Sequence, residues 1–100
     1  MVKWTNHALT QLRHIHDYIE QDSPLYAKRV SEEMLQKTAK LEKLPYMGRK
    51  VAELNEELIR EIALYSYRII YEIKTNDYIE VLAIIHKRQD FIEEDLPQVD

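Results

Sequence analysis

Apolar residues in the first part of the chain recur with the period of a helix. The recurring positions are Ala8, Leu12, Ile15 and Ile19, at steps of four, three and four. This spacing predicts an amphipathic helix, since such positions fall on one helix face. Thr5 or Asn6 is a suitable N-cap for this helix, and we expect it to end near Asp22.

A second helix is predicted directly after the first. Ser23 can cap free backbone N–H groups, and Pro24 suits the first helical position. Its apolar stripe consists of Ala27, Val30, Met34, Leu41 and Leu44. Pro45 and Gly48, the only glycine, mark the end of this helix. Because the joint at Ser23 is short, we expect the two helices to form an antiparallel hairpin.

The second half of the chain has the composition of strands. Residues 58–65, 67–74 and 78–86 are rich in isoleucine, tyrosine and valine, and residues 75–77 suit a hairpin turn. Residues 1–4 are predicted to form a short strand or an extended entry. The element order predicts a single α+β domain, residues 1–100, with the N-terminal helical hairpin packed on one face of a three- to four-stranded antiparallel sheet.

The charge is unevenly distributed along the chain. The net charge is −4, but residues 90–100 hold five acidic residues and no basic one, so the acidity belongs to this tail. The rest is nearly neutral, which argues against a protein that wraps a polyanion unaided. With no cysteine, no signal peptide and no apolar run long enough for a bilayer, we expect a cytoplasmic protein without a membrane partner.

The histidines give no metal signal. His14 and His16 are two residues apart on a helix and therefore point to opposite sides. His7 and His14 can share a face, but this pair has no carboxylate partner. We expect neither a metal site nor a cofactor.

Four segments carry a resemblance to a known family. They are Gly48-Arg49-Lys50-Val51-Ala52-Glu53-Leu54, Ile59-Arg60-Glu61-Ile62, Tyr67-Arg68-Ile69-Ile70-Tyr71, and Val81 to Arg88 with its His-Lys-Arg ending. In this order, and preceded by Trp4 and Ser23-Pro24, which fit the helical part of the family, they resemble the RelE/ParE superfamily of toxins from bacterial type II toxin–antitoxin systems. The resemblance implies a cognate antitoxin as partner, and contact with operator DNA only through that antitoxin.

The superfamily contains two kinds of toxin. RelE-like members cleave mRNA on the ribosome, which requires proton transfer and cations that hold phosphate. For that activity Arg68, His86 and Arg88 are the candidate catalytic residues, and we expect them on one face of neighbouring strands. The lysine pair of RelE-like enzymes is missing, because Ile59-Arg60-Glu61 stands in its place, and Phe91 with acidic neighbours replaces a tyrosine.

ParE-like members inhibit DNA gyrase and need no catalytic residues. The missing lysines and the near-neutral body favour this branch. Its members often engage gyrase through the helical hairpin and the end of the chain. Arg49, Arg60 and Tyr67 are then candidates for binding the target or partner. Two alternatives remain: a ribosome-dependent mRNA endoribonuclease, and an inactive toxin that acts only as co-repressor with its antitoxin.

Each candidate also has a purely structural interpretation. The arginines can be ordinary ion-pair partners of Glu53, Glu61 and Glu72. His86, at a strand end, can simply make a hydrogen bond. Tyrosines on strands are more often packing residues than platforms for bases.

Overall fold

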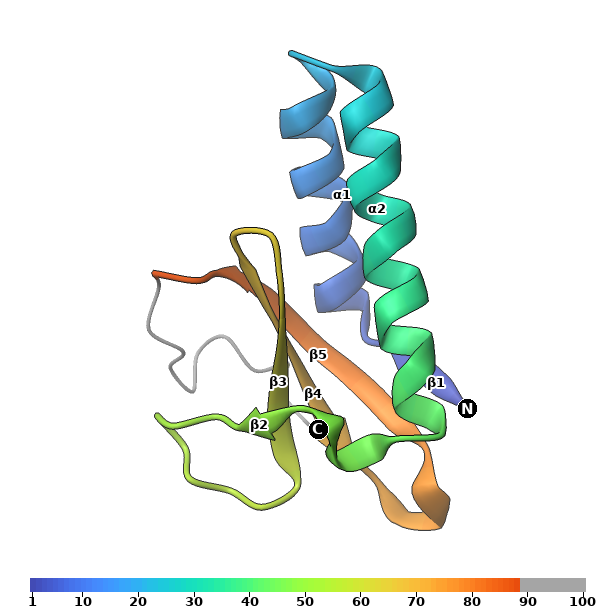
Figure 1. The fold of residues 1–100 in the computed structure, drawn as a ribbon, viewed down its shortest axis with the longest axis vertical. Coiled ribbons are helices and arrows are strands. Elements are labelled where there is room, and N and C mark those ends of the chain that lie inside the picture. Colours follow the sequence, from blue (N-terminus) through green and yellow to red (C-terminus); the bar gives the residue numbers. More distant parts are fainter. Residues whose placement is uncertain (89–100) are drawn as a thin grey trace.

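The computed structural model describes residues 1–88 and contains a five-stranded sheet with two helices on one side (Figure 1). The strands are β1 (Val2–Trp4), β2 (Arg49–Lys50), β3 (Ile59–Leu64), β4 (Tyr67–Ile73) and β5 (Ile79–His86). Their spatial order is β1-β5-β4-β3-β2. Neighbouring strands are antiparallel except β1, which runs parallel to β5.

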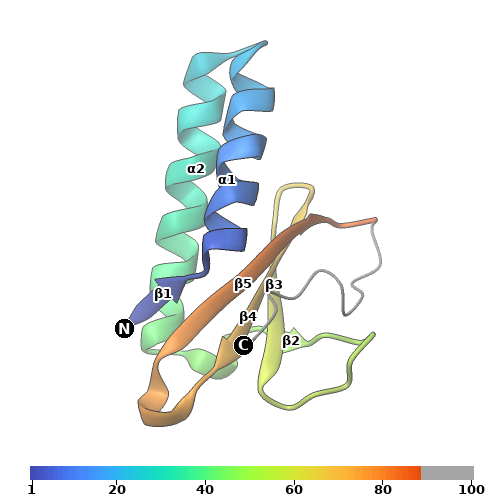
Figure 2. The same ribbon diagram turned by 180° about the vertical axis from the view of Figure 1, so that it is seen from behind.

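The helical hairpin consists of α1 (Asn6–Glu20) and α2 (Pro24–Ala39). Both helices begin at hydroxyl caps: the Thr5 side chain accepts a hydrogen bond from the Ala8 N–H, and Ser23 accepts one from Tyr26. Short 3₁₀ turns, Lys40–Glu42 and Pro45–Met47, lead from α2 to β2. In both ribbon views the joined ends of the helices project beyond the sheet (Figures 1 and 2).

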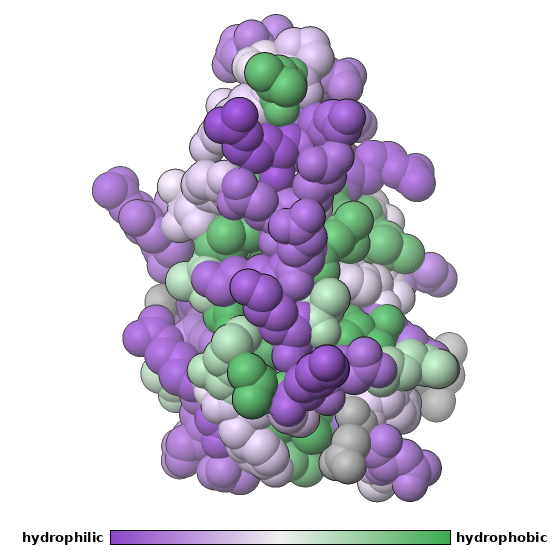
Figure 3. Space-filling view, turned by 45° about the vertical axis from the view of Figure 1, so that its right-hand side comes forward, coloured by the Kyte–Doolittle hydropathy of each residue, from purple (hydrophilic) through white to green (hydrophobic). Residues whose placement is uncertain are grey.

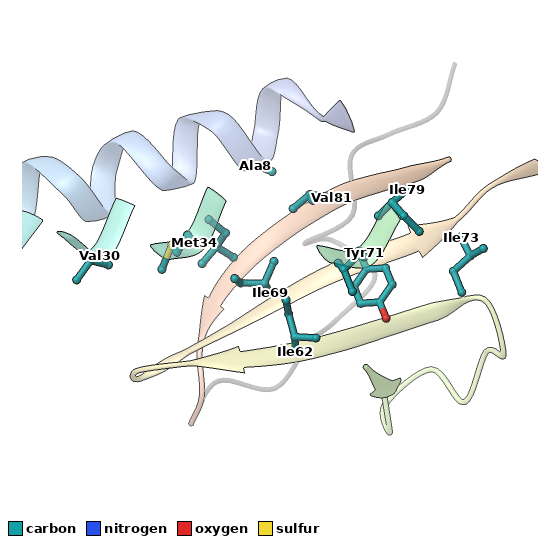
Figure 4. Packing of buried hydrophobic residues seen from close by; sticks show 11 residues of the cluster. Ala8, Val30, Met34, Ile62, Ile69, Tyr71, Ile73, Ile79 and Val81 are labelled. Carbon is teal, nitrogen blue, oxygen red and sulfur yellow. The ribbon is translucent and has the colours of Figure 1, made fainter. Parts of the chain in front are cut away.

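The main core lies between the hairpin and the sheet (Figure 4). Ala8, Val30 and Met34 of the helices are at most 1% exposed. They meet alternate strand residues, which include Ile62, Ile69, Tyr71, Ile73, Ile79 and Val81. Because side chains alternate across a strand, the intervening residues face away from the helices.

The far face of the sheet carries a second apolar cluster. Val51, Ile70, Leu82, Ala83 and Ile85 are buried in it, with Leu54 and Ile59 packed against it. Val51 and Leu54 belong to the segment between β2 and β3. This segment therefore covers part of the sheet face that the helices leave open.

The predicted α+β fold is confirmed, with helix caps at Thr5 and Ser23. The sheet has one strand more than expected, because the three-residue β1 joins β5 and the two-residue β2 joins β3. The parallel β1–β5 pair was not expected; the whole hairpin separates β1 from the other strands and provides the long crossover that parallel pairing needs. The predicted acidic tail, residues 90–100, lies outside the described residues. Neither helix within residues 1–88 has the length and apolar character to span a membrane.

Candidate functional site

Arg68, the second residue of β4, is held by two carboxylates on the far face of the sheet. Its Nη1 and Nη2 donate to the two carboxylate oxygens of Glu53, at 2.8 and 2.9 Å, and its Nε donates to Glu61. Arg68 is only 9% exposed and Glu61 only 4%. The paired oxygens of Glu53 match the fork of the guanidinium group, which is the strongest geometry for such a pair.

Glu61 also joins Arg68 to Arg49. Its other carboxylate oxygen accepts a hydrogen bond from the Arg49 Nε at 3.1 Å. Arg49 lies directly opposite Glu61 in the β2–β3 pair, so the contact follows from the strand register. The Arg49 side chain is 83% exposed, so this arginine presents its charge at the surface while Arg68 does not.

The electrostatics of the network fix the charge state of Arg68. The hydrogen bonds that Arg68 donates to Glu53 raise the pKa of its guanidinium, and the contact with Glu61 raises it further, while burial opposes both. Arg68 is therefore permanently cationic, and its charge is balanced by the carboxylates of Glu53 and Glu61. An incoming phosphate would have to displace one of these carboxylates to be bound by Arg68.

His86 and Arg88 lie close together at the end of β5. The Arg88 backbone N–H donates to Nδ1 of His86 at 3.2 Å, so the ring carries its proton on Nε2 when neutral. Both residues are exposed. The His86 ring also meets Tyr67 edge to face, with 6.2 Å between ring centroids. Burial raises the pKa of the Tyr67 hydroxyl, which keeps it protonated near neutral pH.

The expectation that Arg68 shares a face with His86 is wrong. Tyr67 is the partner of His86 across the β4–β5 ladder, and Arg68 is the partner of Ile85. Directly opposed residues lie on the same face, so His86 and Tyr67 face the helices, whereas Arg68 faces the far side. The register is one residue away from the one that would place Arg68 beside His86.

Arg60 has a structural position on the helix-facing side of β3. It donates to the carbonyl oxygen of Gly48 at 2.9 Å and to Glu57 at 2.8 Å, and its guanidinium lies 4.8 Å from the Tyr46 ring centroid. Its side chain is 13% exposed. Arg60 thus fixes the chain on both sides of β2 and offers little surface to a partner.

The ion-pair partners suggested from the sequence are partly confirmed. Glu53 and Glu61 pair with arginines, but Arg60 pairs with Glu57, and Glu72 pairs with Lys74. No group of three or more acidic or histidine side chains within residues 1–88 has the arrangement of a metal site.

Two lysines beside the network were missed by the sequence reasoning. Lys37 lines one surface hollow and Lys87 lines an adjoining one. The two hollows share Arg49, Glu61, Ala63 and Arg68 in their walls. Lys37 comes from α2 and Lys87 follows β5, so no local spacing connects them. The packing of α2 on the sheet brings Lys37 beside the network, and the pairing of β5 with β4 brings Lys87 there.

Known proteins share the sequence pattern and the fold of this chain. A model of the family described as "ParE toxin of type II toxin-antitoxin system, parDE" matches residues 2–91. Among solved structures, a chain of a chromosomal ParDE toxin–antitoxin system from P. aeruginosa is similar, with a TM-score of 0.69 and 20% identity over 85% of this chain and 92% of that one.

A mutant of the E. coli toxin RelE, solved in the free state, is also similar. Its TM-score is 0.62, with 18% identity over 95% of this chain and 87% of that one. At these identities the structural likeness shows the fold alone. Among curated proteins, no sequence match reaches significance.

Proposed function

The chain belongs to the ParE toxin family of type II toxin–antitoxin systems, and from that premise we propose that it acts by inhibiting DNA gyrase. The proposed inhibition is a binding activity and requires no bond-making chemistry by the toxin. The alternative within the same fold is RelE-like cleavage of mRNA on the ribosome. These two activities place different demands on the charged residues of the sheet.

One observation carries the proposal: Arg68 is held by Glu53 and Glu61 on the face opposite His86. RNA cleavage needs a cation that holds the phosphate next to the group that moves the proton. Here Arg68 is balanced by carboxylates and separated from His86 by the sheet, so of the two candidate arginines only Arg88 remains beside the histidine. The arrangement supports a structural role for Arg68 and disfavours the ribonuclease alternative.

The helical hairpin offers a surface for the proposed target. Tyr18, near the end of α1, is 71% exposed, and Leu25, at the start of α2, is 70% exposed. Both are near the joint between the helices, and the joined ends of α1 and α2 project beyond the sheet (Figure 1). Exposed large apolar side chains are a common feature of protein-binding surfaces when they form a patch. We assign the first contact with gyrase to this projecting end.

A cognate antitoxin is the second proposed partner, and contact with operator DNA would pass through it. The similar P. aeruginosa structure is a ParDE toxin–antitoxin system. Binding of an antitoxin to the folded toxin would raise the toxin's melting temperature, because a partner that binds only the folded state stabilises it. An unchanged melting temperature in the presence of a bound antitoxin would contradict this.

Two assays with the purified chain test the proposed target. In the first, gyrase supercoils relaxed plasmid DNA with increasing amounts of the toxin; in the second, ribosomes translate an mRNA whose ends are mapped. We expect loss of supercoiling and intact mRNA. Cleavage of the mRNA without any effect on gyrase would overturn the proposal, and inactivity in both assays would favour the co-repressor alternative.

A further inference from the structure

The positive charge of the chain is concentrated around the end of α2. Residues 37–50 hold five basic residues and one acidic residue, although residues 1–88 as a whole hold 14 basic residues against 13 acidic ones. The acidic residue, Glu42, is paired with the Met1 ammonium group. This part of the chain is therefore clearly basic, while the remainder of the described residues carries a net negative charge.

Lys40 and Lys43 lie on the same side of the turn that follows α2. The Lys43 N–H donates to the Lys40 carbonyl oxygen at 3.2 Å, which is the i to i+3 bond of a 3₁₀ turn. Side chains three residues apart in such a turn lie one above the other. Both lysines are exposed, and within residues 1–88 neither side chain makes an ion pair or a hydrogen bond.

Lys50 adds a third cation, on the helix-facing side of the sheet. It lies directly opposite Arg60 in the β2–β3 pair, where like charges repel each other. The two cations share the carboxylate of Glu57, whose oxygens lie 3.9 Å from the Lys50 Nζ and 2.8 Å from the Arg60 Nη2. A single carboxylate balances only one of the two cations, so a positive charge is left at this surface.

The turn Pro45–Met47 connects the cations. Tyr46 lies over the Arg60 guanidinium, and Met47 lines a hollow together with Lys40. The other walls of this hollow are Glu33, Gln36, Lys37 and Leu64, so its net charge is also positive. Hydrophilic side chains cover most of the side of the molecule along which α2 runs, as Figure 3 shows. Lys40, Lys43 and Lys50 are called the lysine surface below.

The lysine surface and the projecting end of the hairpin lie near opposite ends of α2. The helix has 16 residues, which corresponds to a length of about 24 Å. In both ribbon views the turns after α2 lie beside the sheet, whereas the joined ends of the helices extend away from it (Figures 1 and 2). A partner bound at the projecting end therefore leaves the lysine surface available for a second contact.

The chemistry of the lysine surface suits a phosphate backbone. Lysine side chains recognise charge more than shape, and contacts with the phosphates of nucleic acids are of this kind. The turns that carry Lys40 and Met47 are three residues long and form no amphipathic helix of the kind that binds membranes. Three lysines give only weak binding by themselves, but a protein that holds DNA close to the toxin would make this contact effective.

We propose that the lysine surface binds the phosphate backbone of the duplex DNA that gyrase holds, while the projecting end of the hairpin contacts gyrase itself. The contact has no sequence preference, because phosphate contacts carry no sequence information. The toxin bridges enzyme and DNA, and each contact strengthens the other. The part that this contact plays in inhibition rests on the proposed function, but the contact with DNA is measurable without gyrase.

The first test measures the fluorescence anisotropy of a short labelled DNA duplex with the purified chain. We expect weak binding at low salt, with a slope of about −3 for log affinity against log salt concentration. The Lys40→Gln, Lys43→Gln variant should bring this slope about two units closer to zero, since each substitution removes one phosphate contact. No binding at low salt, or tighter binding to phosphatidylserine vesicles than to the duplex, would overturn the proposal.

The matched control is a Lys3→Gln, Lys28→Gln variant. It changes the net charge by the same amount, and both lysines are exposed and lie outside residues 37–50. The slope and the affinity for the duplex should stay as in the unaltered chain. Equal losses in the two double variants would show that the overall charge, and not the lysine surface, attracts the DNA.

The second test separates contact with DNA from contact with gyrase. The Lys40→Gln, Lys43→Gln variant should need at least about fivefold more toxin for half-inhibition of supercoiling, with unchanged affinity for gyrase in the absence of DNA. An equal loss of affinity for gyrase alone would assign these lysines to the enzyme and overturn the proposal. If the unaltered toxin leaves gyrase active, the proposed function fails, and the anisotropy measurement still decides whether the lysine surface binds DNA.

Discussion

Arg68 and His86 lie on opposite faces of the sheet, although they come from neighbouring strands and are offset by a single position in the β4–β5 register. The separation divides the charged residues into two groups. Arg68 belongs to a network with Glu53 and the buried Glu61, and His86 belongs to an exposed strand end with Arg88. Their chemistry therefore cannot act on one phosphate in this arrangement.

Loss of Arg68 should destabilise the fold strongly. In the Arg68→Ala variant the buried carboxylate of Glu61 loses the guanidinium that neutralises it, and Glu53 loses a bidentate partner. Removing one member of a buried pair costs about 3–5 kcal/mol. Urea denaturation followed by circular dichroism measures the change in the free energy of unfolding.

Arg49→Ala is the matched control for that experiment. Arg49 binds the same carboxylate, but its side chain is largely exposed and Arg68 remains in place. The expected cost is below about 1 kcal/mol. Equal losses in the two variants would show that Arg68 is not the residue that balances Glu61.

Gly48→Ala should destabilise the chain through lack of space. A Cβ at this position would lie 2.5 Å from the Glu61 carbonyl oxygen and 2.7 Å from the Tyr71 hydroxyl oxygen. Forcing extra volume into a packed site costs about 1–3 kcal/mol. The denaturation midpoint measures this, and an unchanged midpoint would mean that β2 does not approach β3 as closely as described.

The free energy of unfolding should fall at alkaline pH because the buried Tyr71 hydroxyl loses its proton there. Its hydroxyl donates to the Pro45 carbonyl oxygen at 2.6 Å and accepts from the Gly48 N–H at 3.0 Å. Burial raises the pKa of this hydroxyl above the usual value of 10.0. The folded state therefore holds the proton more tightly than the unfolded state, so the stabilisation is fully present below about pH 10 and is lost as pH rises through the raised pKa.

The comparison with Tyr71→Phe isolates this effect. The variant is less stable near neutral pH, because the Gly48 N–H and the Pro45 carbonyl lose their partner. Its unfolding free energy should fall less steeply than that of the unaltered chain above about pH 10. Parallel pH profiles for the two proteins would contradict the assignment.

Local sequence signals were sufficient to predict the helices and strands, but not the register in which the strands pair. The hydroxyl caps at Thr5 and Ser23 and the helical period of the apolar residues act within a few residues, so both helices were predictable. The strand pairing depends on the turn at Tyr65-Ser66, which places Tyr67 opposite Leu64 and hence Arg68 opposite Ala63. A shift of one residue would have moved every side chain of β4 to the other face.

The candidate site was predictable only in part for the same reason. Glu53 and Glu61 were plausible partners from charge alone, but which arginine each one holds depends on long-range pairing. Lys37 reaches Ala63 from α2 across 26 positions of sequence. The parallel β1–β5 pair has no local signal either, because β1 is only three residues long.

The projecting end of the hairpin should determine toxicity without determining stability. A Tyr18→Ser, Leu25→Ser double variant removes two exposed apolar side chains. It should raise the toxin concentration that half-inhibits supercoiling by at least about tenfold, as expected for residues central to an interface. Leu44→Ser, which removes an apolar side chain that is 58% exposed elsewhere, is the control. If Leu44→Ser weakens inhibition as much as the double variant does, the target surface lies elsewhere.

The most direct test of the account uses a His86→Ala, Arg88→Ala double variant in the gyrase supercoiling assay. Both side chains are exposed, so the variant should remain folded, and it lacks the groups that RNA cleavage would require at this strand end. We predict that it inhibits supercoiling within about twofold of the unaltered toxin, because the proposed inhibition involves no proton transfer. The central claim would be contradicted if the folded variant has lost toxicity while the unaltered toxin cleaves mRNA on ribosomes and leaves gyrase active.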